Sequence, residues 1–358
     1  MEKLRVGILA GTGMVGQNYI RLLEDHPWFE VTYVTASPNS AGKRYSEAVE
    51  KKWTMKTEIP ANVRDIVVEN MDQIEKCKKE CEFVFSALDS GIAKEWEHQY
   101  AEAGIPVVSN ASAHRWTEDV PMLIPEINPD HIDIIPIQQK NRGWGKGFIA
   151  VKPNCSLQSY LAPLFALNEF GIRRVIVSTV QALSGGGWKV VSDPKYQHNV
   201  VPYIGGEEEK SEKEPMKILG SIKDGKFVNY DGFTISAICK RGDASDGHLA
   251  DVWVEFERNP TREQILAAWN NFKGVPQELD LPMAPESPIH YIDEPDRPQV
   301  TLDRDIDKGM ACVCGRLQKS NVFDWKFVAL SHNTVRGAAG GGILNAELLY
   351  KKGYLGKQ

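Results

Sequence analysis

One cysteine of this chain is placed to do covalent chemistry. Cys155 stands within Val151–Ser156, directly after the apolar run Gly147–Val151. A thiolate can attack an acyl or carbonyl carbon, and a nicotinamide beside the adduct can exchange a hydride with it. A single cysteine after a strand is more often a small buried apolar residue. The hypothesis of a thioester-forming oxidoreductase therefore depends on the rest of the sequence.

A glycine-rich turn near the N-terminus supplies the nucleotide half of that hypothesis. The pattern predicts a buried strand at 4–10, a G-x-G-x-x-G turn at 11–16 and a helix at 17–24. Glycines let the backbone approach a pyrophosphate, which the N-terminus of the helix stabilises. The residues expected to contact a dinucleotide here are Gly11, Thr12, Gly13, Met14, Val15 and Gly16.

The end of the second expected strand, Phe29–Thr35, indicates which dinucleotide binds. It lacks the acidic residue that would bind a free ribose 2′-hydroxyl. Ser37, Ser40 and Lys43 instead offer hydroxyls and positive charge, which favours the 2′-phosphate of NADP over NAD. An ordinary polar turn is the alternative, because serine and glycine are common turn residues.

Later segments are expected to reach the same edge of this sheet. The apolar runs 81–88 and 105–110 are typical of buried parallel strands. Ligands bind at the carboxyl ends of such strands, which adds Ser86 and Ala87 to the expected cofactor contacts.

The second half of the chain alternates helical and strand patterns around the cysteine. A helix at 157–167 would place the thiol near a helix N-terminus, which is expected to lower its pKa. A strand at 174–183 then runs into a glycine turn. A helix is expected to begin within 205–210, and an alternating strand covers 249–256.

Composition restricts the class of protein. The chain has 358 residues, of which 42% are hydrophobic, and this size suits about two domains. The net charge is −6 without a long basic block, so nucleic acid and membrane are not expected partners. The N-terminal apolar run is too short for a signal peptide, and no run is long enough to span a membrane.

The cysteines point to a reducing compartment. The other five are Cys77, Cys81, Cys239, Cys312 and Cys314, and they form no pair of zinc-type motifs. We expect no metal site, structural roles for Cys77, Cys81, Cys312 and Cys314, and a cytoplasmic protein.

Five motifs, in order along the whole chain, resemble those of the aspartate-β-semialdehyde dehydrogenases, in the branch seen in archaea and fungi. The resemblance implies NADP-dependent reduction of aspartyl-β-phosphate to aspartate-β-semialdehyde with release of phosphate. In the reverse direction, inorganic phosphate is the second substrate. The motifs are Ser109–Arg115, Pro153–Ser156, Glu207–Lys210, the spacing of Arg241 and His248, and Ser331–Gly342.

The resemblance assigns the reacting groups. Cys155 matches the nucleophile that forms a thioester, and His248 matches the general acid/base. An imidazole suits proton transfer near neutral pH. Gln181 matches the residue that positions substrate and thiol.

It also assigns the groups that bind substrate and cofactor. Arg241 matches the arginine that grips the substrate α-carboxylate, and Glu207 the acid that pairs with the substrate amine. Arg115 and Lys210 match the phosphate site, with Asn154 beside the nucleophile. Without the resemblance, Glu207 and Lys210 would be read as a solvated, charged helix start. The remaining expected cofactor contacts are Ser184, Gly185, Asn333 and Gly340.

The chain departs from the family pattern in places. Glycine usually precedes a small residue in the first turn, whereas Ala10 precedes Gly11 here. Asn39 stands where the family often has an arginine for the 2′-phosphate, which weakens the preference for NADP. The run 186–189 also differs, so the local fit to cofactor or substrate is expected to differ.

Three rival functions remain open. Malonyl-CoA reductase shares the scaffold and the thioester chemistry, but it does not need the amine and phosphate groups that Glu207 and Lys210 would bind. N-acetyl-γ-glutamyl-phosphate reductase usually has Pro-Gly before its thiol, where this chain has Pro153–Asn154. A non-catalytic NADP-binding sensor would not need both the cysteine and the histidine.

The expected architecture is α/β, with a Rossmann-like N-terminal domain and an α+β catalytic and dimerisation domain that has a mixed, largely antiparallel sheet. We place the first domain at 1–151, completed by a C-terminal helix within 333–358, and the second at 152–332. The Pro-rich stretch 276–298 is expected to be a loop-bearing insertion. A homodimer or homotetramer is implied by the resemblance alone.

Overall fold

Five parallel strands form the sheet of the N-terminal half. The computed structural model describes residues 2–356. The strands lie in the order β2-β1-β3-β4-β5 and are largely buried, as expected for a parallel sheet covered on both faces. Their bounds are β1 Leu4–Leu9, β2 Phe29–Val34, β3 Phe83–Ser86, β4 Val107–Ser109 and β5 Ile149–Val151.

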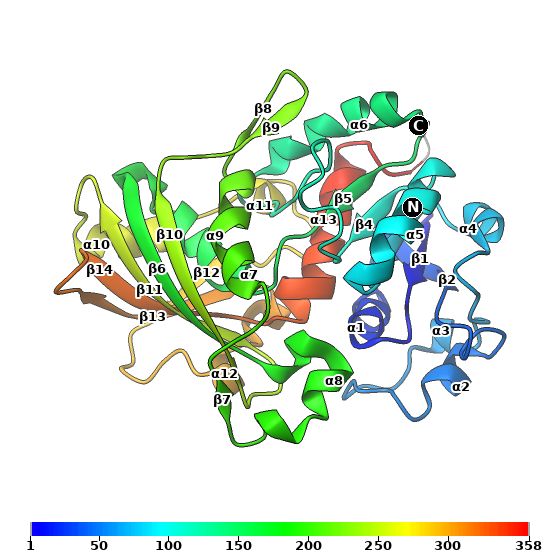
Figure 1. Ribbon diagram of the computed structural model, residues 1–358, viewed down its shortest axis with the longest axis horizontal. Helices are drawn as coiled ribbons and strands as arrows, with labels where there is room; N and C mark the ends of the chain where they lie inside the picture. Colours follow the sequence, from blue (N-terminus) through cyan, green and yellow to red (C-terminus); the bar gives the residue numbers. More distant parts are fainter. Residues whose placement is uncertain (1, 357–358) are drawn as a thin grey trace.

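Helices connect and cover these strands (Figure 1). Helix α6 ends at Gly143, whose φ of 68° is a left-handed conformation that suits a glycine C-cap. The helices of this half are α1 Met14–Leu22, α2 Tyr45–Val49, α3 Ala61–Arg64, α4 Ile74–Glu80, α5 Ser90–Glu102 and α6 Ile135–Arg142.

A seven-stranded sheet dominates the second half, in the order β12-β13-β14-β11-β6-β10-β7. It is mixed, because β6 pairs in parallel with β10 and β12 in parallel with β13, while the other pairs are antiparallel. The strands are β6 Ile172–Gln181, β7 Val200–Val201, β10 Thr234–Gly242, β11 His248–Phe256, β12 Ile289–Ile292, β13 Cys312–Lys319 and β14 Trp325–Ser331.

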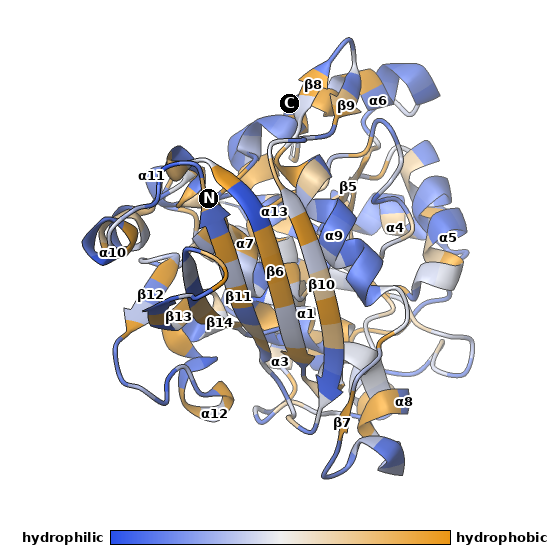
Figure 2. Ribbon diagram, turned by 60° about the vertical axis from the view of Figure 1, so that its left-hand side comes forward, coloured by the Kyte–Doolittle hydropathy of each residue, from blue (hydrophilic) through white to orange (hydrophobic). Residues whose placement is uncertain are grey.

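One face of this sheet is covered by helices and the other is open. Helix α7 packs on β11, β13 and β14, and α9 packs on β10. On the open face, Ile176 of β6 and Ile238 of β10 are exposed, in the region that Figure 2 turns toward the viewer. The helices are α7 Leu157–Phe165, α8 Gly187–Val191, α9 Glu207–Ile218, α10 Arg262–Asn271, α11 Val275–Glu278 and α12 Val300–Asp303, and a hairpin joins β8 Ser221–Lys223 to β9 Lys226–Val228.

The end of the chain returns to the first sheet. A π-helical turn, Val335–Ala339, leads into α13, Gly340–Lys351, which contacts α1 and β4 (red in Figure 1). Ile343 and Leu348 share one apolar cluster with Val6 and Phe29. Burial of each such side chain stabilises the fold by about 1.5–3 kcal/mol. Helix α13 therefore completes the core around the parallel sheet.

The predicted fold class is confirmed, with one local correction. The stretch 276–298, expected to be a loop, contains the strand β12, which pairs with β13 at the edge of the seven-stranded sheet. Its prolines flank the strand and so leave its backbone N–H groups free to pair. The domain boundaries stay a prediction. Within residues 2–356, no helix combines the length and the apolar character needed to cross a membrane.

Candidate active site

A cleft of about 220 Å³ runs between the two halves and contains Cys155. It brings together residues from the ends of β5 and β6, the start of α9 and the segment before α13. The predicted site residues that line it are Val15, Arg115, Asn154, Cys155, Gln181, Ser184, Gly185, Glu207, Lys210, Arg241 and Asn333.

The thiol in this cleft contacts the imidazole of His248, which is buried and does not itself line the cleft. Cys155 Sγ lies 3.3 Å from His248 Nε2. Cys155 follows β5 and comes just before α7, while His248 is the first residue of β11. The Ala182 N–H donates to His248 Nδ1 at 3.0 Å. A neutral imidazole held in this way carries its proton on Nε2, facing the sulfur.

Burial sets the protonation of this pair. It lowers the pKa of His248 to about 3, and the charge of Arg241 acts in the same direction. Burial also raises the pKa of the Cys155 thiol, although Lys152, Arg241 and Arg115 oppose this shift. The expected lowering of the thiol pKa by the α7 N-terminus is therefore wrong in net direction, because desolvation dominates.

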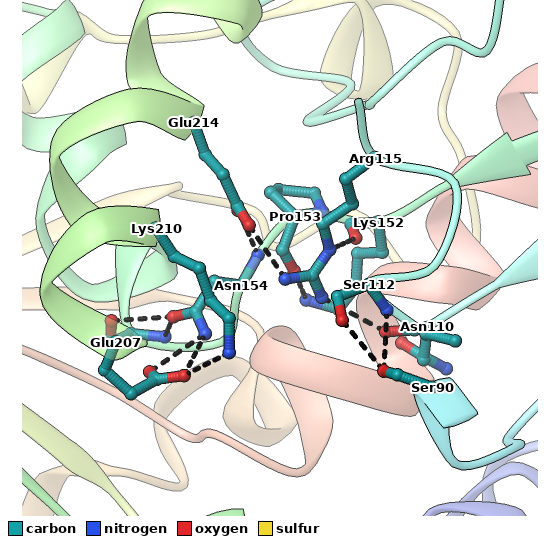
Figure 3. A network of polar contacts seen from close by, with 12 residues as sticks. Ser90, Asn110, Ser112, Arg115, Lys152, Pro153, Asn154, Glu207, Lys210 and Glu214 are labelled. Atoms are coloured by element: carbon teal, nitrogen blue, oxygen red, sulfur yellow. Dashed lines mark hydrogen bonds and ion pairs between the residues drawn. The ribbon is translucent and has the colours of Figure 1, made fainter. Parts of the chain in front are cut away.

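Two carboxylates of α9 hold the loop that carries the nucleophile (Figure 3). Asn154 Nδ2 donates to both oxygens of Glu207, at 3.0 and 2.9 Å. The Asn154 N–H donates to Glu214 Oε2 at 2.7 Å, and Ser156 donates from its N–H and its hydroxyl to Asn154 Oδ1. Hydrogen bonds of Asn154 and Ser156, the residues before and after Cys155, therefore hold the loop in place.

The same carboxylates hold the cations. Lys210 Nζ donates to Glu207 Oε1 at 2.8 Å, and Arg115 Nη1 donates to Glu214 Oε1 at 2.8 Å. Burial opposes ionisation of Glu207, but Lys210 and Asn154 bring its pKa below the ordinary value. Glu207, Lys210 and Glu214 are spaced three and four residues apart, so they share one face of α9.

Arg241 and the glycine turn close the other side of the cleft. Arg241 Nη1 donates to Ala182 O at 2.7 Å, which leaves the rest of its fork available to an anion. Asn333 Nδ2 donates to Ser184 Oγ at 2.8 Å and its Oδ1 accepts from the Gly247 N–H. These two hydrogen bonds connect the segment before α13 to the turn after β6 and to the residue before β11.

The glycine-rich turn between β1 and α1 is built to approach a phosphate. No side chain among residues 2–356 caps the N-terminus of α1, which begins after Gly13. A Cβ at Gly16 would lie 2.5 Å from Ala10 O, so only glycine lets the helix approach this closely. Free N–H groups and the helix dipole suit an anion here.

The turn after β2 suits a 2′-phosphate. Ser37 and Lys43 are exposed, and Lys43 Nζ contacts only Asn39 O among the described residues. Ser40 is buried, and its N–H donates to Ser37 O. No acidic side chain lies between Thr35 and Lys43. These features, together with the α1 N-terminus, fit a dinucleotide with a 2′-phosphate.

Besides the residues of the glycine-rich turn other than Val15 and those of the turn after β2, three further predicted cofactor contacts also lie outside the cleft lining. The hydroxyl of Ser86 is buried and donates to Glu97 Oε1 at 2.7 Å, and Ala87 follows it at the end of β3. Gly340 faces the interior, since a Cβ there would lie 2.6 Å from Met310 Sδ. Gly337 and Ala338 line the cleft in its place.

Sequence reasoning did not assign five further polar residues at or beside the site. Glu214 and Lys152 are buried, and Asn110 lines the cleft with Ser90 and Ser112. The helical spacing from Glu207 could have indicated Glu214. Within residues 2–356, no group of His, Cys, Asp and Glu side chains is arranged to hold a metal ion.

Known proteins share this arrangement over the whole chain. Residues 5–135 match the family "Semialdehyde dehydrogenase, NAD binding domain", and residues 161–336 match "Semialdehyde dehydrogenase, dimerisation domain". An aspartate-semialdehyde dehydrogenase of Archaeoglobus fulgidus is 46% identical over 97% of this chain and 98% of its own length. A malonyl CoA reductase (NADP) of Metallosphaera sedula is 39% identical over 99% of each chain.

A solved structure agrees with the sequence relatives. The aspartate semialdehyde dehydrogenase of Candida albicans, solved with NADP, is 39% identical and superposes with a TM-score of 0.89 over 99% of this chain and 100% of that one. The match therefore extends over both sheets. The chain belongs to the aspartate-semialdehyde dehydrogenase family.

Proposed function

We propose that the chain reduces aspartyl-β-phosphate to aspartate-β-semialdehyde with NADPH, releasing phosphate, through a thioester on Cys155. The observation that carries this proposal is the 3.3 Å contact between Cys155 Sγ and His248 Nε2 inside a cleft lined by cations. Membership of the family supports the activity and the cofactor. The roles of individual residues follow from the geometry of the cleft.

Acyl transfer is the first step. The sulfur of Cys155 attacks the acyl carbon, the bond from that carbon to the phosphate oxygen breaks, and phosphate leaves with the electron pair. The proton of the thiol ends on the departing phosphate. Arg115 and Lys210, which lie beside the Cys155 loop, would stabilise the phosphate charge.

Reduction and release complete the reaction. NADPH, held by the Gly11–Gly16 turn and by Ser184, Gly185 and Asn333, would supply the hydride that reduces the thioester. His248 shares its Nε2 proton with the oxygen as negative charge develops there, and takes it back when the C–S bond breaks. The aldehyde departs and the Cys155 sulfur leaves as a thiolate, which takes up a proton from solvent to restore the resting thiol.

Substrate is held by groups of opposite charge. Arg241 would grip the α-carboxylate with the part of its fork that Ala182 O leaves free. Glu207 would accept the α-ammonium group, and Asn154 keeps that carboxylate in place. Gln181 lines the cleft at the end of β6, where it would orient the acyl group.

The cofactor would lie across the ends of β1 and β2. The backbone of Gly11–Gly16 and the α1 N-terminus would bind the pyrophosphate. Ser37, Ser40 and Lys43 would surround the 2′-phosphate, with the hydroxyl of Ser40 reached after a small movement of the turn because it is buried. Asn333, Ser184 and Gly185 would line the nicotinamide end.

Malonyl-CoA reduction is the second candidate, because one relative of that name is as similar as the Candida albicans structure is. The Glu207–Lys210 pair favours the aspartyl substrate, since malonyl-CoA has no ammonium group for Glu207 to bind. An assay of NADP reduction with aspartate-β-semialdehyde, with and without inorganic phosphate, tests the proposal. Phosphate-dependent NADPH formation supports it. NADPH oxidation with malonyl-CoA alone would establish the second candidate.

We also propose that the enzyme is a homo-oligomer built on the open face of the seven-stranded sheet. Ile176 and Ile238 are 41% and 56% exposed on that face, which is unusual for large apolar residues of a sheet. The family description of this half as a dimerisation domain supports the assignment. Ile238→Lys should shift the protein toward the monomer in analytical ultracentrifugation. An unchanged dimer or tetramer would contradict this interface.

The reducing cytoplasm is the compartment we propose for this enzyme. All six cysteines are free thiols, including the one that must stay reduced for acyl transfer. Fluorescence of a tagged full-length chain in its host would test the location.

A further inference from the structure

Lys152 is a buried cation without a matching anion. Its side chain is 2% exposed, and Nζ donates one hydrogen bond, to Pro153 O at 2.7 Å (Figure 3). Within residues 2–356 it forms no ion pair with a carboxylate. A buried charge is costly unless it is paired and hydrogen-bonded. Such a residue is most easily explained by an anion that forms during the reaction.

A second buried lysine shows what a purely structural role looks like. Lys217 Nζ donates to Arg115 O, Thr117 O and Val120 O, at 2.6, 3.1 and 2.9 Å. These three carbonyls use all three of its donors, and they clamp the loop that carries Arg115. Lys152 lacks such a set of partners.

Lys152 and the nucleophile lie against the same C-terminal helical segment. A Cβ at Gly337 would lie 3.0 Å from Cys155 Cβ, and a Cβ at Gly341 would lie 3.1 Å from Lys152 Cδ. Lys152 also stands three residues before Cys155, and both residues line the cleft.

The protonation of His248 and Cys155 explains why the thiol needs a further positive charge nearby. His248 already carries its proton on Nε2, so in its neutral form it cannot take the proton of Cys155. Arg115 is paired with Glu214, and Arg241 donates to Ala182 O. Burial lowers the pKa of Lys152 to about 7, and the negative charge of Cys155 works against that shift.

We propose that Lys152 is a positioning residue that stabilises the thiolate of Cys155 before acyl transfer. Its Nζ lies 2.7 Å from the Pro153 carbonyl oxygen, in the same loop as Cys155. It acts on the sulfur through its charge and makes no bond to substrate. This role rests on Cys155 as the nucleophile of the proposed function.

The test measures alkylation of Cys155 by iodoacetamide against pH in the full-length enzyme without substrates. Cys155 is the partly exposed cysteine among the six, and the other five are buried, so mass spectrometry of its peptide isolates the reaction. Lys152→Met keeps the length of the side chain and removes the charge. Lys152→Gln is the second variant if the methionine variant does not fold, and melting curves report folding.

Lys152→Met should slow alkylation at pH 7 about tenfold, which corresponds to one pKa unit for the thiol. The difference should shrink at alkaline pH, where the thiol ionises in both proteins. Lys152→Arg should restore most of the rate, whereas Lys226→Met, a control at an exposed lysine of β9 outside the cleft, should alkylate like the parent enzyme.

One result would overturn the proposal, namely a Lys152→Met enzyme that alkylates like the parent at every pH. A raised KM for inorganic phosphate in that same enzyme would then make Lys152 a phosphate ligand. If alkylation depends on Lys152 but the enzyme does not oxidise aspartate-β-semialdehyde, the proposed function fails and the thiolate assignment stands.

Discussion

Two turns on the same edge of the parallel sheet differ in the groups that they offer to a ligand. The turn Ala10–Gly16, between β1 and α1, contains no charged residue and works through its backbone. The turn Lys152–Ser156, between β5 and α7, is surrounded by ionised side chains from α9, β10 and the loop after β4. The first suits a cofactor that binds unchanged at its phosphates, and the second suits a substrate whose charge changes during reaction.

The difference teaches where the information for each site lies. The first turn is specified within about one strand, one turn and one helix of local sequence. The second depends on partners far away in the chain, because Asn154 binds a carboxylate 60 residues on and Cys155 contacts an imidazole 93 residues on. Substitutions in the two turns should therefore fail in different ways.

The largest effect is expected at the nucleophile. Cys155→Ala should lower turnover by at least about 10⁴-fold and leave NADP affinity nearly unchanged, because it removes the atom that forms the thioester. Steady-state assays and fluorescence titration with NADPH measure the two quantities. Cys314→Ala, at a buried thiol of β13, should keep most of the activity. Appreciable turnover in Cys155→Ala would refute the covalent route.

A smaller loss is expected at the imidazole. His248→Gln should lower kcat by about 10²-fold, the usual contribution of a proton-transferring group. Since burial lowers the pKa of His248 to about 3, its protonation should not shape the activity profile between about pH 5 and pH 8. The acid limb of the profile should therefore persist in the variant. Its disappearance would mean that His248 titrates in that range.

Stability provides a second measurement on the same variant. The unfolded chain protonates this imidazole below about pH 6.5, whereas the folded protein does so only near pH 3. The stability that the neutral histidine contributes is thus fully present above about pH 6.5, and it falls as the pH drops from about 6.5 to about 3. Urea unfolding of His248→Gln should show a weaker dependence on pH there. As a control, His98→Gln, which lies outside the cleft, should show the same pH dependence of urea unfolding as the parent enzyme.

A substitution in the glycine-rich turn should weaken the binding of NADP. Gly16→Ala would bring a Cβ to 2.5 Å from Ala10 O and 2.5 Å from Gly11 Cα, so the turn must open. NADP affinity should fall at least about tenfold, which corresponds to 1.4 kcal/mol. In the matched control, Gly205→Ala, the new Cβ meets only Tyr203 Oη at 3.7 Å. Equal NADP affinity in both variants would contradict the role of the turn.

The smallest effect is expected at Ala10. This residue has φ of 59°, a left-handed conformation that costs an L-residue about 1–2 kcal/mol and glycine almost nothing. Ala10→Gly should raise the free energy of unfolding by about 0.5–1 kcal/mol, after the added entropy of the unfolded chain is subtracted. Urea unfolding measures it. The same change in a helix, Ala48→Gly, should lower stability by about 1 kcal/mol.

Sequence patterns predicted the elements well where local rules apply. The strands β1 to β5 and the helices α1 and α7 lie within or beside the predicted ranges, because apolar runs and the glycine turn are local signals. The strand β12 was missed, since its four residues pair at a sheet edge between prolines. Most of the residues that line the cleft are ones that the sequence had singled out, and their roles stay predictions.

What the patterns could not predict is the electrostatic balance of the cleft. The thiol pKa was expected to fall at a helix N-terminus, but burial raises it. Lys152 and Glu214 gave no sign of their burial, because a lysine after a strand and a glutamate in a charged helix are usually solvated. Desolvation and long-range pairing are properties of the folded chain and of no short segment.

The return of α13 to the parallel sheet sets the order in which the protein can be assembled. During synthesis, β1 and β2 leave the ribosome long before Ile343, Leu344 and Leu348 exist to cover Val6 and Phe29. The half that is made first therefore cannot close its core until the last helix has been translated. The N-terminal segment would therefore need a chaperone that shields apolar surface for the longest time. Loss of the final turns of α13 would damage the N-terminal nucleotide domain more than the seven-stranded sheet.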